Sequence, residues 1–198
     1  MEKIDWSNFS SSVLLEVSRE KEIFVFSGVA INSTTILTAA HCLEGEVTKI
    51  RVSIDSSYNK NGHFIEVKSF ERSPDFENGM DLAKIKLCKN LPKGTVFYPI
   101  IKKNHQLVGQ IFRVGYGTRN KQNIRTLLNP YLKQIIHLNK LLVLEDLYSF
   151  PGDSGGPVFL QTAGQIYLVA IHSKKTTNPR AKYSLNTLLS SHREWIAC

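Results

Sequence analysis

Ser154 lies in the segment SFPGDSGGPVF (residues 149–159), which surrounds one aspartate–serine pair with three glycines and two prolines. Glycines on both sides of a serine let the backbone adopt conformations that other residues avoid, and they let peptide N–H groups come close to a reacting atom. A serine hydroxyl is a weak nucleophile until a base removes its proton. The segment therefore predicts a nucleophile and requires a histidine elsewhere; a glycine-rich turn without chemistry is the alternative.

The best candidate for the base is His41, in TILTAAHCLEG at residues 35–45. This histidine follows an apolar segment of β type, and the small alanines before it allow a tight turn into a short helix. Four other histidines stand in polar or helical contexts that favour surface or core positions: His63, His105, His137 and His192. The sequence therefore favours His41 as the general base.

Asp81 is the candidate for the carboxylate that orients the base. It opens the segment DLAKIKL, where period-2 alternation places it on one face with Ala83, Ile85 and Leu87. A buried carboxylate is costly unless it has partners, so this position demands a donor such as an imidazole N–H. A strand-start cap that turns to solvent is the alternative.

Short strands must position these three residues. Alternating or apolar runs separated by turn residues predict five strands in each half, within residues 11–18, 22–31, 48–55, 63–70 and 81–87, and then 110–118, 132–138, 140–146, 155–161 and 165–173. The segment 88–109 has two prolines and little alternation, which is typical of a connection between two β units. We predict an N-terminal domain over residues 1–100, a C-terminal domain over residues 101–198 and one terminal helix within residues 186–198.

Composition narrows the class of protein. The net charge is +8, but the 25 Lys and Arg residues are spread along the chain with only short clusters such as IKKNHQ, which favours a solvated surface over a nucleic-acid interface. No apolar run approaches the roughly 20 residues that cross a bilayer. Three distant cysteines, Cys42, Cys88 and Cys198, exclude a complete disulfide framework and suit a reducing compartment.

Three motifs together resemble the trypsin/chymotrypsin-like serine endopeptidase family. They are TAAHC, DLAKIKL and PGDSGGP, in the order histidine, aspartate, serine. SGVAINSTTILTAAHC is similar to the strand pair that leads to the base, VGYGT to a Gly-aromatic-Gly segment, and HREWI to a terminal helix. The resemblance spans nearly the whole chain and implies an all-β fold of two six-stranded antiparallel barrels with a C-terminal helix.

The resemblance also implies a mechanism. Ser154 would attack a peptide carbonyl, His41 would take and later return its proton, and Asp81 would hold the imidazole. The N–H groups of Gly152 and Ser154 would form the oxyanion hole. Ser173 matches a serine that supports the carboxylate, and residues 173–175 match the strand edge that pairs with substrate backbone.

The expected specificity pocket lacks the carboxylate that cleavage after Lys or Arg requires, because Tyr148 stands six residues before the nucleophile. Ser149, His172 and Lys175, with Lys174 beside them, are similar to the set used by the compact bacterial glutamate-specific and exfoliative-toxin-like branch. The sequence therefore predicts cleavage after Glu or Asp, weakening as pH rises if the imidazole must be protonated. A core histidine and a solvated lysine turn are the alternative.

Two departures from the family pattern bear on folding and activation. The usual cysteine partner of Cys42 would stand at Phe26, so that disulfide is missing. Many family members use a freed amino terminus to pair with the aspartate before the nucleophile, here Asp153, yet no IVGG-like start is visible. We expect Asp153 to be satisfied either by the start of the chain or by an internal donor.

The prediction is therefore a serine endopeptidase that acts on proteins or peptides, as a monomer, without nucleic acid, membrane, metal or cofactor. A catalytically silent binding module of the same fold is the rival from another class, and a protease of non-acidic specificity is a further alternative. We expect a cytoplasmic location, or a secreted one if the chain is a processed form.

Overall fold

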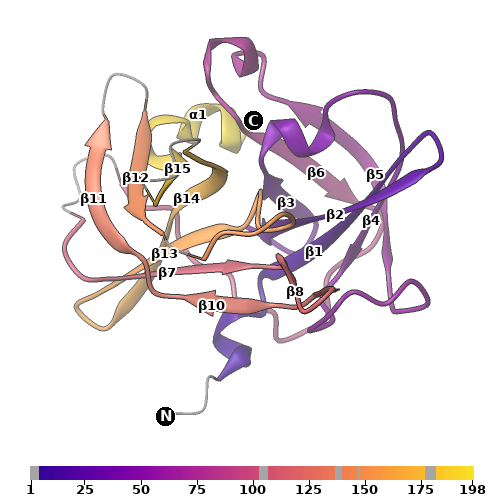
Figure 1. The fold of residues 1–198 in the computed structure, drawn as a ribbon, viewed down its shortest axis with the longest axis horizontal. Coiled ribbons are helices and arrows are strands. Elements are labelled where there is room, and N and C mark those ends of the chain that lie inside the picture. The colour runs from indigo at the N-terminus through magenta and orange to yellow at the C-terminus, as the bar shows by residue number, and fades with distance from the viewer. Residues whose placement is uncertain (1–4, 103–106, 137–139, 147, 177–181) are drawn as a thin grey trace.

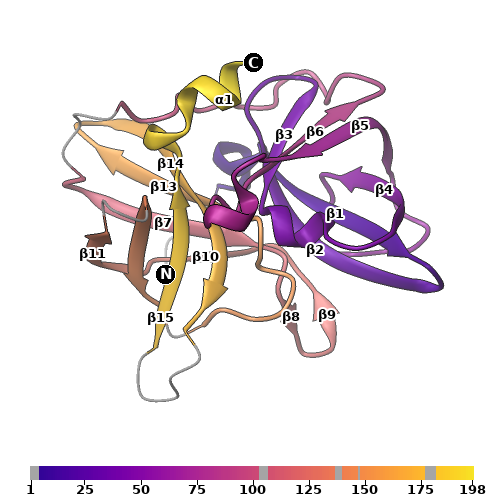
Figure 2. The ribbon, with the colours of Figure 1, turned by 90° about the horizontal axis from the view of Figure 1, so that it is seen from above.

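The computed structural model describes residues 5–102, 107–136, 140–146, 148–176 and 182–198. Figure 1 shows two β units side by side, the first built from strands early in the chain and the second from later strands. Figure 2, turned by 90°, keeps the two units apart and places α1 beside both of them. The predicted all-β class with a C-terminal helix is confirmed.

The first unit is a closed antiparallel barrel in the order β1-β2-β3-β6-β5-β4. Its strands are β1 (Ser12–Arg19), β2 (Glu22–Ala30), β3 (Thr35–Thr38), β4 (Val47–Ser53), β5 (Ile65–Arg72) and β6 (Ala83–Leu87). Branched aliphatic side chains from these strands fill its interior, including Val13, Leu15, Ile36, Val52 and Ile85, all fully buried. Closure leaves no unpaired edge strand in this unit.

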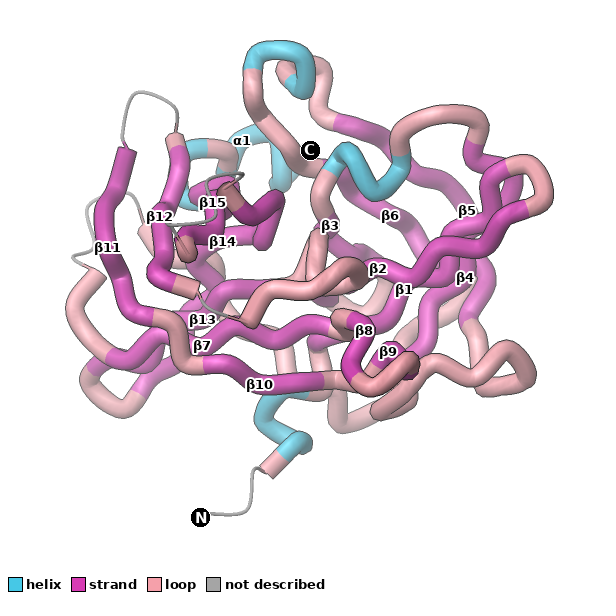
Figure 3. Tube along the Cα trace, in the orientation of Figure 1, coloured by secondary structure: helices cyan, strands magenta, loops and turns pink. Residues whose placement is uncertain are grey.

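The second unit is a seven-stranded sheet rather than the six-stranded barrel expected from the resemblance, in the order β10-β7-β13-β14-β15-β12-β11. Its strands are β7 (Gln110–Gly115), β10 (Thr126–Leu128), β11 (Tyr131–Ile136), β12 (Leu141–Glu145), β13 (Pro157–Thr162), β14 (Gln165–Lys175) and β15 (Tyr183–Leu188), and a separate two-stranded sheet joins β8 (Thr118–Arg119) to β9 (Gln122–Asn123). Figure 3 shows how loops connect these strands. The predicted domain boundary falls in the segment between β6 and β7.

The terminal helix is shorter than predicted. Residues Tyr183–Leu188 form β15, the single turn η4 (Leu189–Ser191) follows, and α1 covers only Arg193–Ala197. The polar side chains of Ser184 and Asn186 are fully buried in β15 while Leu185 is half-buried. This pattern is the inverse of the usual alternation, in which apolar residues face inward, so it gives no strand signal in the sequence.

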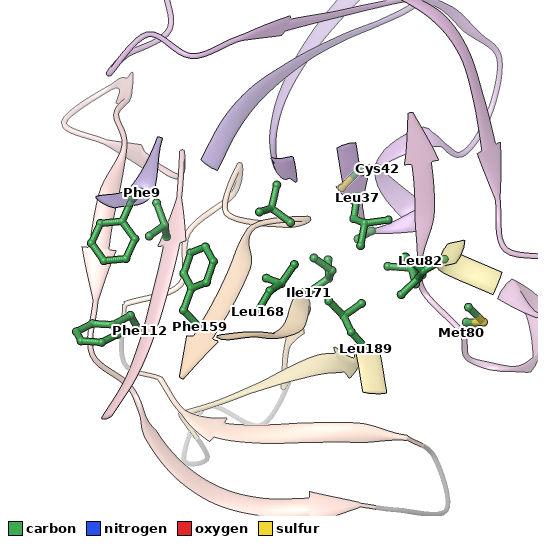
Figure 4. Packing of buried hydrophobic residues seen from close by; sticks show 14 residues of the cluster. Phe9, Leu37, Cys42, Met80, Leu82, Phe112, Phe159, Leu168, Ile171 and Leu189 are labelled. Carbon is green, nitrogen blue, oxygen red and sulfur yellow. The ribbon is translucent and has the colours of Figure 1, made fainter. Parts of the chain in front are cut away.

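A hydrophobic cluster joins the two units. It combines Leu37, Cys42 and Leu82 from the first unit with Phe112, Phe159 and Ile171 from the second, together with Leu189 after β15 (Figure 4). In addition, η1 (Trp6–Phe9) contributes Phe9, whose ring lies 5.8 Å from that of Phe159. Since His41 and Asp81 adjoin cluster members in sequence, this packing fixes the first unit's candidate residues against the second unit.

All three cysteines are free thiols; Cys42 is buried, whereas Cys88 and Cys198 are exposed. Within the described parts of the chain, no helix has the length and apolar character needed to cross a membrane.

Candidate active site

His41 and Asp81 are held together by two hydrogen bonds. The short helix η2 (Ala40–Leu43) follows β3 and carries His41, whose backbone N–H donates to Asp81 Oδ1 at 2.9 Å. The ring Nδ1 lies 2.7 Å from Asp81 Oδ2, and because a carboxylate only accepts, Nδ1 carries the proton. Nε2 is then the basic nitrogen, which is the tautomer that a general base needs.

Ser173, on β14, gives Asp81 a further partner. Its hydroxyl donates to Asp81 Oδ2 at 2.5 Å, and the hydroxyl of Thr187 donates to the backbone carbonyl of Asp81 at 3.2 Å. Burial alone would raise the pKa of Asp81, but the bonds from His41 and Ser173 outweigh it and lower that pKa. Asp81 is therefore an anion held by both units of the protein.

The ion pair also changes the acidity of His41. Burial is the largest single influence and favours the neutral ring, but the hydrogen bonds and charges of Asp81 and Cys42 together outweigh it and raise the pKa of His41 to about 10. The neutral form of His41, which acts as the base, therefore becomes populated at a higher pH than the neutral form of an exposed imidazole.

Ser154 stands on a turn that only glycine neighbours permit. Gly152 and Gly155 both have positive φ, +100° and +83°, and a Cβ on Gly155 would collide with Thr38 and with the carbonyl of Ser27. Ser27, on β2, ties this turn to the first barrel, because its hydroxyl donates to the carbonyl of Gly152 at 2.7 Å and its N–H to that of Ser154 at 2.9 Å.

The hydroxyl of Ser154 donates to the backbone carbonyl of Ser173 at 3.2 Å. His41 Nε2 lies 3.7 Å from Cys42 Sγ, and no hydrogen bond joins Ser154 to His41 among the described residues. Rotation about the Cα–Cβ bond of Ser154 changes the partner of its hydroxyl, and catalytic hydrogen bonds are commonly long or misaligned without substrate. Ser173 thus touches Ser154 through its carbonyl and Asp81 through its side chain.

The backbone N–H groups around Ser154 differ in whether they donate a hydrogen bond. Asp153 N–H donates to the carbonyl of Phe150 at 3.0 Å and Gly155 N–H to that of His172 at 2.8 Å. Among the described residues, none accepts a hydrogen bond from the N–H of Gly152 or of Ser154. These are the two donors predicted for the oxyanion hole.

Asp153 is fully buried and surrounded by internal donors. Oδ1 accepts from the N–H of Gly117 at 2.7 Å, and Oδ2 accepts from the N–H of Phe150 at 3.0 Å. The guanidinium of Arg119 lies 3.0 Å from Oδ2 and that of Arg113 lies 3.3 Å from it. Burial would raise the pKa of Asp153, but the two arginines outweigh it and lower that pKa.

Sequence reasoning missed both arginines. Arg113 is fully buried on β7 and also pairs with Asp146 at 2.8 Å. A signal was present, because an arginine inside the apolar strand QIFRVG needs a buried acid as its partner. Nothing local marks Arg119, which reaches Asp153 from the β8–β9 hairpin.

His172 and Ser149 are in contact, as the predicted pocket requires. The Nε2 atom of His172 lies 2.9 Å from Ser149 Oγ, and Nδ1 lies 3.0 Å from Asn186 Oδ1. The amide nitrogen of Asn186 donates to the carbonyl of Leu142 at 2.9 Å, which leaves its Oδ1 to accept from Nδ1–H. Burial, together with the charge of Arg113, lowers the pKa of His172 to about 4, so the ring is neutral at pH 7.

The remaining predicted pocket residues lie nearer the surface. The side chain of Tyr148 is 59% exposed, and its carbonyl accepts from Arg119 at 3.2 Å. Lys174 and Lys175, at the end of β14, are exposed. Four histidines were expected at surface or core positions. His63 is exposed and His192 is buried, whereas His105 and His137 lie outside the described residues.

Two hollows flank His41. One, of about 620 Å³, is lined by Asp81, Ser173 and Lys174 with the apolar side chains of Leu141 and Leu185. The other, of about 470 Å³, is lined by one cation, Arg19, and by four carboxylates, those of Glu20, Glu22, Glu44 and Glu46. The second hollow therefore has an excess of negative charge, which disfavours an acidic side chain there.

Two comparisons relate the chain to known proteins. The family model described as Trypsin matches residues 7–196. Vitamin K-dependent protein C from Mus musculus is 23% identical over 213 residues, covering 89% of this chain. The match covers 46% of the mouse protein, so the chain spans about half the length of this relative.

Proposed function

Since the chain belongs to the trypsin family, we propose that it is a serine endopeptidase in which Ser154, His41 and Asp81 form the catalytic triad. The observation that carries this proposal is the set of contacts among them: Asp81 holds His41 at 2.7 Å, and Ser173 contacts both Asp81 and Ser154. Substrates are proteins or peptides, as is general for the family.

The reaction proceeds in two halves. Ser154 Oγ attacks the scissile carbonyl carbon while His41 Nε2 takes its proton, and the resulting imidazolium, stabilised by Asp81, gives that proton to the leaving amine. The acyl-enzyme is then hydrolysed by water, with His41 again acting first as base and then as acid. Asp81 stays ionised throughout, consistent with its lowered pKa.

The N–H groups of Gly152 and Ser154 bind the oxyanion that forms on the carbonyl oxygen. Their lack of an acceptor among the described residues leaves them free for this role. Removing one donor of this kind costs about 2.7–4 kcal/mol of transition-state stabilisation.

A reactive fluorophosphonate separates the enzyme from its rival, a catalytically silent binding module. We expect the wild-type protein to be labelled on Ser154, because the probe needs an activated serine and a free oxyanion hole. Ser154→Ala should abolish labelling, whereas Ser149→Ala should retain it. Absence of labelling of the wild-type protein across pH 6–9 would favour the binding module.

For specificity, we propose that Ser149, His172 and Lys175 select an acidic side chain at the residue that supplies the scissile carbonyl, as in the glutamate-specific branch. Support comes from the Ser149–His172 contact at 2.9 Å and from Lys174 and Lys175 at the end of the same strand. Because His172 is neutral in the free protein, the positive charge comes from the lysines and the imidazole contributes hydrogen bonding.

Cleavage profiling on a peptide library should show hydrolysis after Glu or Asp. Lys175→Met should lower the preference for Glu over Gln by about tenfold, the value of one charge-assisted hydrogen bond. The preference should stay constant between pH 5.5 and 8, since the pKa of His172 is about 4 and its ring does not change protonation across this range.

Lys60→Met, on an exposed loop, is the matched control and should leave the profile unchanged. Dominant cleavage after Lys, Arg or large aromatic residues would contradict the acidic specificity but not the peptidase. A preference for Glu that falls from pH 5.5 to 8 would instead assign the charge to His172.

A further inference from the structure

A hollow of about 730 Å³ is lined by neither Ser154 nor His41 and shares no lining residue with the two hollows beside His41. It forms where the segment leading to Asp81, represented by Asp75 and Met80, meets the connection between the two units and the residues around α1. Its volume falls in the range of small-molecule pockets. The peptidase mechanism uses none of the side chains that line it.

Three cations surround this hollow: Lys102, Lys140 and Arg193. Arg193 donates to the carbonyl of Ile100 at 3.0 Å, while the described residues offer no hydrogen-bond or ion-pair partner to the ammonium groups of Lys102 and Lys140. Two carboxylates, Asp75 and Glu194, also line the hollow. Three positive charges against two negative charges leave an excess of one positive charge.

His192 lines the hollow, and the residue is 7% exposed. Its ring nitrogens make no hydrogen bond to the described residues and remain accessible to solvent. Burial, together with the charge of Lys140, lowers the pKa of His192 to about 4, so the ring is neutral at pH 7 and keeps one N–H donor. A ligand acceptor in the hollow would replace solvent as the partner of this N–H.

Most of the remaining wall is apolar, although Ser190 and Ser191 also line it. Met80, Ile101, Leu107 and Leu188 line the hollow, together with the half-buried ring of Trp195. A ligand that fits must therefore combine one anionic group with a hydrocarbon body.

We propose that this hollow binds a small monoanion of the alkyl carboxylate class. The carboxylate accepts hydrogen bonds from Lys102, Lys140 and His192, and the alkyl chain lies against the apolar wall. The site is independent of the proposed peptidase function and lies behind the segment that ends at Asp81.

Trp195 provides the readout, because the only other tryptophan is Trp6. In the Trp6→Phe protein, titration with octanoate should change the fluorescence of Trp195 and saturate. Hexanoate should bind about 10- to 15-fold more weakly, because each buried methylene is worth about 0.8 kcal/mol, or three- to fourfold. Nuclear magnetic resonance of the His192 ring protons in the unmodified protein gives a second measurement that needs no substitution.

Lys140→Met and His192→Gln should each weaken octanoate binding by about tenfold. Lys60→Met should have no effect, and Ser154→Ala should bind octanoate like the wild-type protein. Equal binding of octylamine or octanol would overturn the proposal, because the cations would then play no part. So would the absence of any change in both Trp195 fluorescence and the His192 resonances, or equal affinities for the Lys140→Met and Lys60→Met proteins.

Discussion

Replacing Ser154 by alanine should lower kcat for peptide hydrolysis on the order of 10⁶-fold, and His41→Ala should cost nearly as much. The double variant should be no slower than either single one, because a base without its nucleophile, or a nucleophile without its base, contributes little. Residual hydrolysis should remain above the uncatalysed rate, since the oxyanion donors Gly152 and Ser154 keep their backbone N–H groups.

The measurement is steady-state hydrolysis of a peptide with an acidic residue before the scissile bond, together with thermal unfolding of each variant. Ser154→Ala removes one hydroxyl and little packing, so its Tm should match that of the wild-type protein. Ser69→Ala, on an exposed position of β5, is the control. A double variant far slower than both single variants would show that Ser154 and His41 do not act as one unit.

The residues proposed for chemistry could be identified from sequence because each carries a local signal. Each signal lies within a few residues of the side chain that it marks. These signals are the glycines around Ser154, the small residues before His41 and the acid at the start of an apolar strand. The structure then brings His41 and Asp81 to 2.7 Å although 40 residues separate them. Ser173 was predicted only through the resemblance, and it links the two units at Asp81.

The other features of the fold and the site depend on contacts between distant parts of the chain, which no local sequence pattern encodes. Strand β15 was missed because Asn186 is buried to bond His172 and the carbonyl of Leu142, so a polar residue occupies an inward position. The closed first barrel agrees with its alternating strands, whereas the second unit gained β10 and β15 as additional strands. Arg119 was missed because its role arises only when the β8–β9 hairpin lies beside Asp153.

The contacts of Asp153 determine whether the proposed peptidase needs a free amino terminus for activity. Both of its carboxylate oxygens already accept hydrogen bonds from Gly117, Phe150 and Arg119, and Arg113 adds a further positive charge. The start of the chain, residues 1–4, lies outside the described residues, but a terminal ammonium would have to displace one of these donors. Of the two partners expected for Asp153, we therefore favour the internal one.

Arg119→Met should lower kcat/KM by about 10²- to 10³-fold, the loss that follows from misplacing one oxyanion donor, because Asp153 lies between the N–H groups of Gly152 and Ser154. Arg119 is the better target of the two arginines. Removing Arg113 would leave Asp146 buried without its cation and Asp153 with Arg119 as its one cation, at a cost of about 3–5 kcal/mol in folding stability. Lys121→Met, in the same hairpin, is the matched control and should keep full activity.

Adding four residues before Met1 should leave kcat/KM unchanged if Arg119 and Arg113 satisfy Asp153, because no terminal ammonium is then needed to order the Ser154 turn. If the terminus inserts instead, the extended protein should lose activity by a factor similar to that of Arg119→Met, while Arg119→Met itself should have little effect. The fluorophosphonate labelling rate distinguishes these results from general unfolding, since it reports on Ser154 and the oxyanion donors alone. An extended protein that keeps its Tm but loses labelling would therefore assign the Asp153 contact to the amino terminus, whereas full labelling means that the arginine pair keeps the site assembled without proteolytic processing.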